Sequence, residues 1–313
     1  MFRNRASTTA FFIIAAVSAA VAIPACRLGS ESPTVQGDEA AQGSQDRRVR
    51  AASSSSSTAD DTHAGGGNIS GNVARAAKSR RRIPRNEHVE HFSAAKKLLR
   101  RVYEGHQITL YCGCAYDARG TVNRSSCGYV PRGDTTRTRR IEWEHVVPAH
   151  AFGQAFASWR DGHDSCVRGS GDAAKPYKGR ECARKVDAPF RFMEADMYNL
   201  YPAVGELNEK RGNRRMGMIE GEPRAFGKCD FEVDEQRAEP RPEVRGDIAR
   251  TYKYMDMAYP GRGIISQSNR KLFDAWDEQD PVDAWECERS RRIAKVQGNI
   301  NEIVDAACRA ANL

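Results

Sequence analysis

The sequence predicts an α+β domain, rich in helices and poor in strands, that follows a long polar N-terminal segment. Apolar residues recur at helical spacing in several stretches after residue 91, and only two short stretches carry the β-branched and aromatic signal of strands. The residues before 91 show no such periodicity. The chain of 313 residues contains no visible internal repeat, so we expect one domain over residues 91–313.

An apolar stretch near the N-terminus predicts export. The run "FFIIAAVSAAVAIPAC" follows a short basic start, has the length of a signal-peptide core, and is short for a transmembrane helix. We therefore expect a signal peptide over residues 1–25. Two processing routes stay open: cleavage at the small-x-small pattern "AVA", or a lipoprotein box "IPAC" in which Cys26 becomes the lipidated first residue.

Residues 26–90 are expected to form a disordered linker. The stretches "AASSSSSTADD" and "HAGGGNISGN" are rich in Ser and Gly and cannot bury enough apolar surface to fold. The linker ends in "KSRRRIPR", which is either a solvated linker end or an arm that attracts phosphates.

The charge of the chain is compatible with a nucleic-acid partner but does not establish one. The formal net charge is +8, and the first ninety residues carry 12 Lys/Arg against 8 Asp/Glu, so residues 91–313 hold a net charge of only +4. A local basic cleft would have to attract a polyanion.

Hydrophobic patterning gives the expected elements of the first half of the domain. Residues 92–106 have helical spacing, and residues 107–117 and 139–147 have the composition of strands. A proline precedes a second helical stretch at 149–159, since proline is tolerated in a first turn. The polar segment 160–188 is expected to be a long loop.

The second half of the domain is predicted to be helical. Residues 190–213 have mostly helical spacing broken at Pro202, and two amphipathic helices are expected within 242–259 and 269–279. One further helix is expected to close the chain over residues 283–308.

Eight cysteines remain when Cys26 is set aside, and an even number in an exported domain predicts up to four disulfides. Eight cysteines allow 105 pairings, so the sequence alone does not fix them. Two partial expectations are that Cys166 and Cys182 hold the 160–188 loop and that the last two cysteines staple the C-terminal segment. A zinc site is disfavoured, because only one residue separates the first two cysteines. The eight are Cys112, Cys114, Cys127, Cys166, Cys182, Cys229, Cys287 and Cys308.

The stretch "RIEWEHVVPAH" places an acid beside a histidine, Glu144 and His145, in an otherwise apolar strand. Burying such a pair is costly unless it is hydrogen-bonded or bound to metal. Hydrolysis of a phosphodiester needs a base to activate water and a cation to stabilise the growing charge. A histidine is a base near neutral pH, and a carboxylate with an asparagine carbonyl suits Mg²⁺.

Several segments together resemble the bacterial endonuclease I family, which are periplasmic or secreted non-specific nucleases. The similarity runs in the expected order from Tyr111 to the C-terminus and leaves the N-terminal segment outside. It implies a helix-rich single α+β domain built around a ββα-metal motif, in which two strands and a helix clasp one divalent ion. The segments are "LYCGCAYD", "SCGYVPR", "RIEWEHVVPAHAFG", "MEADMYNLYPAVGELNEKRGN", "KCDFEVD", "RGDIARTYKYM" and "LFDAWDEQDPVDAWECERSRRIAKVQGN".

The resemblance implies a role for several residues of this site. His145 matches the general base of the family and Glu144 its metal-binding carboxylate. Asn208, in "GELNEKR", matches the metal-binding asparagine, and Asn199, in "MYNLYP", is the alternative for that role.

The family also places an arginine between the histidine and this helix, where its planar fork grips the phosphate. Arg180 is the preferred match, and Arg184 and Arg168 are alternatives.

These features predict an exported, Mg²⁺-dependent endonuclease with little sequence preference, with Ca²⁺ or Mn²⁺ as substitute ions. The expected substrate is double- or single-stranded DNA, with RNA as a further candidate, and the resemblance implies products that carry 5′-phosphate ends. The alternative is a non-catalytic DNA-binding lipoprotein tethered to the cell surface. No protein partner is implied, a monomer is expected, and only a lipid anchor at Cys26 would attach the chain to a membrane.

The predicted roles carry a geometric demand. Neighbouring residues of a regular strand point to opposite faces, so the strand should end or bulge at Glu144–His145 for both to serve one site.

Overall fold

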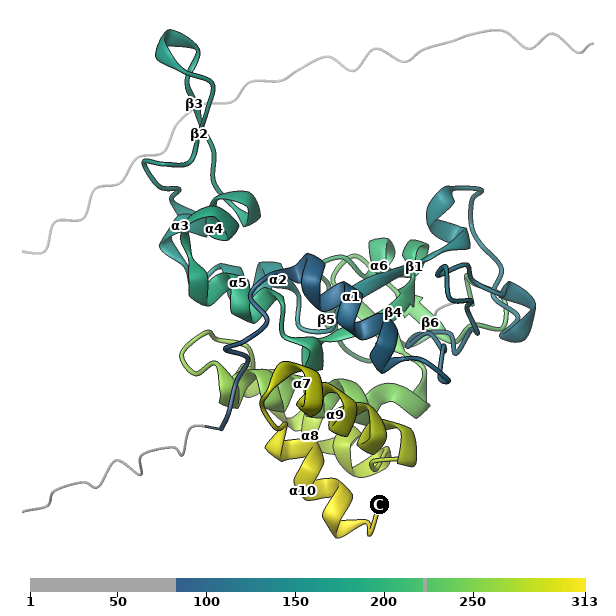
Figure 1. Cartoon of the computed structure of the whole chain (residues 1–313). Coiled ribbons are helices and arrows are strands. Elements are labelled where there is room, and N and C mark those ends of the chain that lie inside the picture. Colours follow the sequence, from purple (N-terminus) through teal and green to yellow (C-terminus); the bar gives the residue numbers. More distant parts are fainter. Residues whose placement is uncertain (1–82, 222–223) are drawn as a thin grey trace, which may run out of the picture. The chain divides into compact units, whose positions relative to one another are not determined.

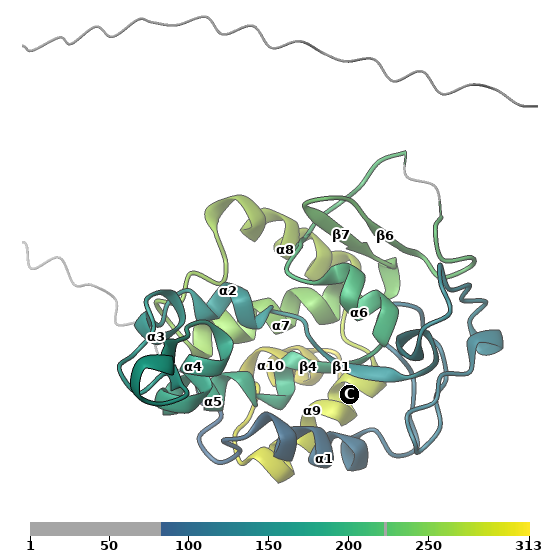
Figure 2. The same cartoon turned by 90° about the horizontal axis from the view of Figure 1, so that it is seen from above.

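A two-stranded antiparallel sheet lies at the centre of the domain (Figures 1 and 2). Strand β1 (Ile141–His145) pairs with β4 (Leu200–Val204), in a register that runs from Ile141 opposite Val204 to His145 opposite Leu200. The computed structural model describes residues 83–221 and 224–313. The predicted signal peptide, Cys26 and nearly all of the predicted linker lie outside the described residues.

Helices cover both faces of this sheet. In Figure 2 the sheet lies between α6 (Gly205–Arg211) on one side and α1 (Phe92–Val102) with α9 (Ala284–Gln297) on the other. The predicted helix at α1 is confirmed, and it buries Ala95, Leu99 and Val102 as its apolar spacing requires. The pair β1–β4 and the helix α6 that follows β4 directly are the two strands and the helix of the expected motif.

The predicted strand over residues 107–117 is wrong. This segment forms turns and makes isolated bridges, between Ile108 and Ala115 and between Tyr116 and Val122. Two disulfides link this segment to different parts of the chain, Cys112 to Cys229 and Cys114 to Cys127. The glycine between these cysteines has φ +66°, which a regular strand does not contain.

The partner strand of β1 lies instead in the segment predicted to be helical. Residues 188–211 form α5 (Ala188–Glu194), a 3₁₀ turn (Met197–Asn199), β4 and α6 in succession. All five residues of β4 are buried, including Pro202, whose carbonyl accepts a hydrogen bond from the Leu110 amide at 2.8 Å. Pairing with β1 therefore decides the structure here against local helical spacing.

Two predicted elements of the middle segment differ from the prediction: a helix is divided, and a loop contains regular structure. The helix after Pro148 is divided into α2 (Ala149–Gly153) and α3 (Ala157–Arg160). The predicted 160–188 loop contains a short hairpin, β2 (Val167–Arg168) with β3 (Lys175–Pro176), and the helix α4 (Arg180–Val186). The hairpin extends away from the helices in Figure 1, and the Cys166–Cys182 disulfide closes the loop at its base as predicted.

A second sheet packs beside α6 (Figure 2). Its strands are β5 (Arg215–Met216), β6 (Phe231–Val233) and β7 (Arg237–Pro240), in the order β5-β7-β6. Short 3₁₀ turns connect other elements, at Arg124–Ser126, Thr136–Arg139, Gly171–Ala173 and Pro242–Val244.

The C-terminal third is helical, as predicted, with one more break than expected. Helices α7 (Arg245–Ala258) and α8 (Gln267–Gln279) form an extensive contact. The single closing helix is instead α9 and α10 (Glu302–Ala310), because Gly298 ends α9 in the left-handed conformation and Asn301 caps α10.

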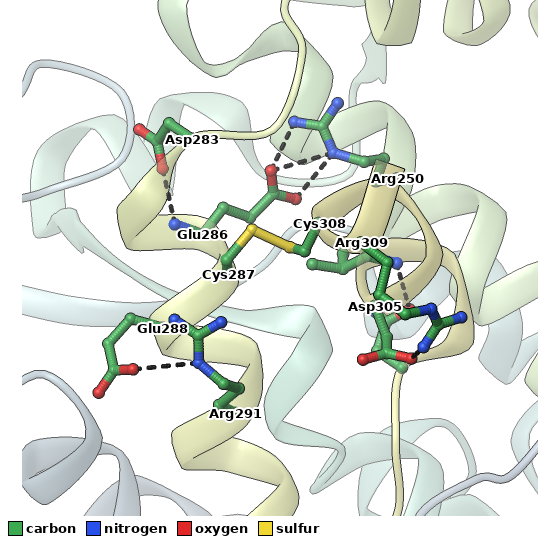
Figure 3. Close-up of a disulfide and its surroundings, with 11 residues drawn as sticks. Arg250, Asp283, Glu286, Cys287, Glu288, Arg291, Asp305, Cys308 and Arg309 are labelled. Atoms are coloured by element: carbon green, nitrogen blue, oxygen red, sulfur yellow. Dashed lines mark hydrogen bonds and ion pairs between the residues drawn. A yellow bond between two sulfur atoms is a disulfide. The ribbon is translucent and has the colours of Figure 1, made fainter. Parts of the chain in front are cut away.

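The predicted staple of this last segment is present as the Cys287–Cys308 disulfide (Figure 3). Beside it, the buried Arg250 of α7 binds both carboxylate oxygens of Glu286 in α9. All eight predicted cysteines are thus paired in four disulfides. Within the described residues, no helix has the length and apolar character needed to cross a membrane.

Candidate active site

A broad groove of about 1410 Å³ runs along β1, α1 and the start of α6. Four of the predicted site residues border it: Glu144, His145, Arg180 and Asn208. Seven further cations border it from α1, from the segment before β1 and from the 116–120 turn. They are Lys96, Lys97, Arg100, Arg101, Arg119, Arg137 and Arg140. The local basic cleft that the modest net charge required is therefore present.

His145 is held with one nitrogen free to act as a base. Its Nε2 donates to the main-chain carbonyl of Glu194 at 2.8 Å, which leaves Nδ1 as the unprotonated nitrogen of the neutral ring. Burial lowers the pKa of His145 to about 3, and the nearby Arg180 charge adds to this, while the bond to Glu194 opposes it. The imidazole is therefore neutral at physiological pH. The Phe92 ring lies 4.8 Å from the imidazole and fixes it from the side of α1.

Glu144 is oriented by two groups that bind the same oxygen. Tyr111 donates its hydroxyl to Oε1 at 2.7 Å, and the buried Arg211 donates to the same atom at 2.9 Å. No hydrogen bond from the described residues reaches Oε2. Burial raises the pKa of Glu144 even though Arg211 opposes the shift. The side chain thus presents one unused oxygen, while its other oxygen is paired with the Arg211 guanidinium.

Arg211 also fixes the exit of the strand. Its guanidinium donates to the carbonyls of His145 at 2.7 Å and of Val146 at 2.5 Å. It lies one helical turn after Asn208 on α6, so the same helix face contacts the strand and borders the groove.

Asn208 is oriented by a second acid of the strand, Glu142. The Asn208 amide nitrogen donates to Glu142 Oε2 at 2.8 Å, and Arg137 donates to the same oxygen at 2.5 Å. The amide oxygen of Asn208 accepts no hydrogen bond from the described residues. Glu142 and Glu144 are two residues apart on one strand and therefore share a face, which brings the unused oxygens of Glu144 and Asn208 to one side of the sheet.

Arg180 and Arg184 converge on one buried carboxylate. The Nε atoms of both donate to Glu194, which is 2% exposed, with Arg184 at 2.7 Å from Oε2. These two arginines hold the pKa of Glu194 below its usual value, although burial opposes them. Arg180 also has a buried Nη2 that lacks an acceptor among the described residues. Only Arg180 of this pair borders the groove.

The two other alternative residues lie elsewhere. Arg168 is in the exposed β2–β3 hairpin, where it pairs with Glu181 and stacks on Tyr177. Asn199 is fully buried, and its amide holds the backbone of Val147 through one donated bond at 3.0 Å and one accepted bond at 2.7 Å. Neither residue borders the groove.

Of the two expected alternatives at Glu144–His145, a bulge is not present, whereas the strand does end at His145. Pairing with β4 is regular through His145, and the strand ends there, so the two side chains lie on opposite faces. Both nevertheless border one groove, because they lie at the last two positions of the strand beside that groove.

Sequence reasoning missed four residues that hold the site: Tyr111, Glu142, Glu194 and Arg211. Each lies inside a segment that carried the family resemblance, in "LYCGCAYD", "RIEWEHVVPAHAFG" or "MEADMYNLYPAVGELNEKRGN". The alternation of a strand already placed Glu142 on the face of Glu144, and that signal could have identified it.

The chain is similar to several known proteins over most of the described domain. The family model "Endonuclease I" matches residues 91–308. An extracellular deoxyribonuclease of Aeromonas hydrophila is 44% identical over 227 residues, which cover 71% of this chain and 92% of the relative. A periplasmic deoxyribonuclease of the same organism is 44% identical over 223 residues, covering 69% and 86%. Endonuclease-1 of Buchnera aphidicola from Acyrthosiphon pisum is 36% identical over 225 residues, covering 70% and 82%.

The family match begins at α1 and ends within α10, and it includes every residue that borders the groove. The chain therefore belongs to the Endonuclease I family and is an endonuclease.

Proposed function

We propose that this protein is an exported, divalent-metal-dependent endonuclease that hydrolyses DNA with little sequence preference. The observation that carries the proposal is the convergence of a neutral histidine, an oriented carboxylate, an amide oxygen and an arginine on one basic groove. The relatives that are named deoxyribonucleases support DNA as the substrate class.

The donor set fits a hard divalent cation. Glu144 Oε2 and the Asn208 amide oxygen accept no hydrogen bond from the described residues, and both side chains border the groove. Carboxylate and amide oxygens suit Mg²⁺, which keeps several of its waters, and Ca²⁺ or Mn²⁺ would use the same donors. A cation here would also compensate the buried Glu144. When bound, the ion would stabilise negative charge on the phosphate and the leaving oxygen.

The residues of the chain perform the remaining tasks. His145 Nδ1 accepts the proton of the attacking water, since Nε2 is committed to the Glu194 carbonyl. Arg180 holds the scissile phosphate, whose oxygens would supply the acceptor that its Nη2 lacks. Attack of water on the phosphorus with departure of the 3′ oxygen leaves a 5′-phosphate end on the product.

The cations of α1 extend the phosphate-binding surface beyond the reacting group. Lys96, Lys97, Arg100 and Arg101 form two pairs one turn apart, and none of the four makes an ion pair with the described residues. Such contacts bind phosphates without reading bases, so we propose that double- and single-stranded DNA both bind, with RNA as a further substrate.

We propose that the N-terminal segment directs export of this domain. The exported domain is proposed to be a monomer. Residues 1–25 would act as the signal peptide and residues 26–90 as the linker, with the mature chain released or anchored through Cys26. Relatives named extracellular and periplasmic support export. The second candidate, a non-catalytic DNA-binding lipoprotein, shares the basic groove but does not require the oriented His145.

Nicking of supercoiled plasmid separates the two candidates. The enzyme should nick with Mg²⁺, lose activity in EDTA and regain it when Mg²⁺ is restored. Plasmid retention without nicking under all three conditions would support the binding protein instead. Mass spectrometry of the mature N-terminus would show whether Cys26 carries lipid.

A further inference from the structure

A second pocket, of about 370 Å³, lies outside the groove and shares no lining residue with it. Its walls come from the first described residues of the chain, from α5, and from the segments after α2 and α7. The side chains that matter here are Arg85, Phe156, Phe192, Met193, Tyr259 and Arg262.

The wall formed by residues 85–87 is fixed in place by a buried asparagine. Asn86 is 1% exposed, and its amide nitrogen donates to the carbonyls of Val89 at 2.6 Å and Phe192 at 2.8 Å. Its oxygen accepts from the amides of His88 and Val89. These bonds attach the segment to α5, so the pocket is formed without a ligand.

Arg262 supplies a positive charge to this pocket. Its guanidinium lies 4.2 Å from the centre of the Phe156 ring, and its only hydrogen bond within the described residues is a long one, 3.5 Å, to the Ala155 carbonyl. No carboxylate of the described residues lies within ion-pair distance of it. Burial lowers the pKa of Arg262, with Asp187 opposing and Arg85 adding to the shift. Arg85 itself pairs with Glu87 at 3.0 Å.

The remaining walls are apolar and largely aromatic. Phe156 and Tyr259 are buried, Phe192 is half-buried, and Met193 forms the fully buried floor. The Tyr259 hydroxyl is bonded to Asp196, so its ring presents a fixed surface. A guanidinium stacked on a ring leaves the donors at its edge directed outward, which suits an anionic group of a ligand whose body is flat and aromatic.

We propose that this pocket binds a mononucleotide, with its phosphate on the Arg262 fork and its base against the aromatic walls. Phosphate suits two donors in one plane, and bases stack on aromatic side chains with little preference among bases. The volume is at the lower end of the range for small-molecule sites, so one nucleotide fits and an oligonucleotide does not. Nucleotides with a terminal phosphate belong to the chemical class that a nuclease generates.

Methyl-labelled methionine NMR tests the proposal directly, because Met193 reports on the pocket and the exposed Met218 does not. The probe is 2′-deoxyadenosine 5′-monophosphate, added to the full-length protein in the absence of divalent ions. We expect a saturable shift of the Met193 signal, assigned with Met193→Leu, and at least tenfold weaker binding in Arg262→Gln. Arg262→Lys keeps the charge without the planar fork, so its affinity for the nucleotide should lie between those of the wild type and Arg262→Gln. Arg291→Gln, at an exposed arginine of α9, is the matched control and should bind like the wild type.

Three further ligands make the result decisive. Deoxyadenosine and inorganic phosphate should each bind at least tenfold more weakly than the nucleotide. If inorganic phosphate bound as tightly as the nucleotide, the pocket would be a simple anion site and the proposal would be overturned. Octanoate binding more tightly than the nucleotide would also overturn it. The nucleotide must also shift Met193 in Arg180→Gln, since a shift lost there would place it in the groove. Plasmid nicking by Arg262→Gln should stay within twofold of wild type, which keeps this test separate from the proposed catalytic mechanism.

Discussion

Glu194→Gln is the substitution that best tests how the groove is organised. The variant keeps the size of the side chain and the main-chain carbonyl that accepts from His145. It removes the charge that binds Arg180 and Arg184. The proposed base, His145, therefore stays in place while Arg180, the proposed phosphate-binding residue, loses its anchor, and this predicts a loss of kcat with little change in KM.

The structure bounds both magnitudes. Removing one partner of a fully buried ion pair costs about 3–5 kcal/mol of stability, and a surface pair contributes about 0–1 kcal/mol. Glu194 is buried, but the Arg180 and Arg184 side chains are 37% and 40% exposed, so water can solvate them once the acid is neutral. We therefore expect a loss of about 2 kcal/mol. A reacting group misplaced by about 1 Å can lose on the order of 100-fold in rate, which sets the expected fall in kcat.

Steady-state cleavage of a fluorescent duplex and urea unfolding measure these two quantities. Arg180→Gln should reproduce the kcat loss, and the double variant with Glu194→Gln should add little to it, because both act through one contact. Arg184→Gln should lose stability with a smaller effect on kcat, since Arg184 does not border the groove. Glu181→Gln, in an exposed pair, is the control and should stay within about 0.5 kcal/mol. A kcat within threefold of wild type in Glu194→Gln, or a loss confined to KM, would refute this reasoning.

Four further results are expected. His145→Ala should reduce plasmid nicking by at least about 100-fold while DNA retention in a gel-shift assay persists, and near-wild-type nicking would exclude it as the base. Glu142→Ala should weaken Mg²⁺ binding about tenfold in calorimetry, because it removes the acceptor that holds the amide of Asn208, and unchanged affinity would argue against that orienting role. Loss of the Cys287–Cys308 disulfide, whose cysteines are 21 residues apart, should cost about 3 kcal/mol in urea unfolding with nicking retained at low temperature. Full reduction of the disulfides should inactivate the enzyme, and activity that survives excess dithiothreitol would contradict that expectation.

Local patterns predicted the helices well and the strands poorly, for a physical reason. The apolar spacing of α1 and α8 is visible in the sequence because each of these helices buries one face. Strand β4 has no such local signal, since all five of its residues are buried and one of them is Pro202. Its conformation depends on β1, which lies more than fifty residues earlier in the chain. The false strand at 107–117 has the opposite origin: its composition suits a strand, but two disulfides and a left-handed glycine force turns.

In the candidate site, too, some residues could be predicted from local sequence and others depend on distant contacts. Glu144, His145 and Asn208 could be named from the sequence because the chemistry of hydrolysis and the family resemblance both require those residue types. Of the residues that orient them, Glu142 could be found from strand alternation. Arg211 and Glu194 could not, because they act through contacts with main-chain carbonyls and between distant segments. A sequence pattern identifies the groups proposed to react, whereas the network that holds them is visible only in three dimensions.

The regular end of β1 changes how the Glu144–His145 pair can work. If both side chains had to turn to one face, the strand would need a bulge, and the pairing through His145 shows none. The structure instead orients the two side chains through different partners. On one face, Tyr111 and Arg211 orient Glu144 near Asn208, and on the other, the Glu194 carbonyl fixes the tautomer of His145. Arg211 binds both Glu144 and the main-chain carbonyl of His145, so it connects the two faces of the strand. Arg211→Lys should therefore disturb Glu144 and His145 together, even though Arg211 does not border the groove.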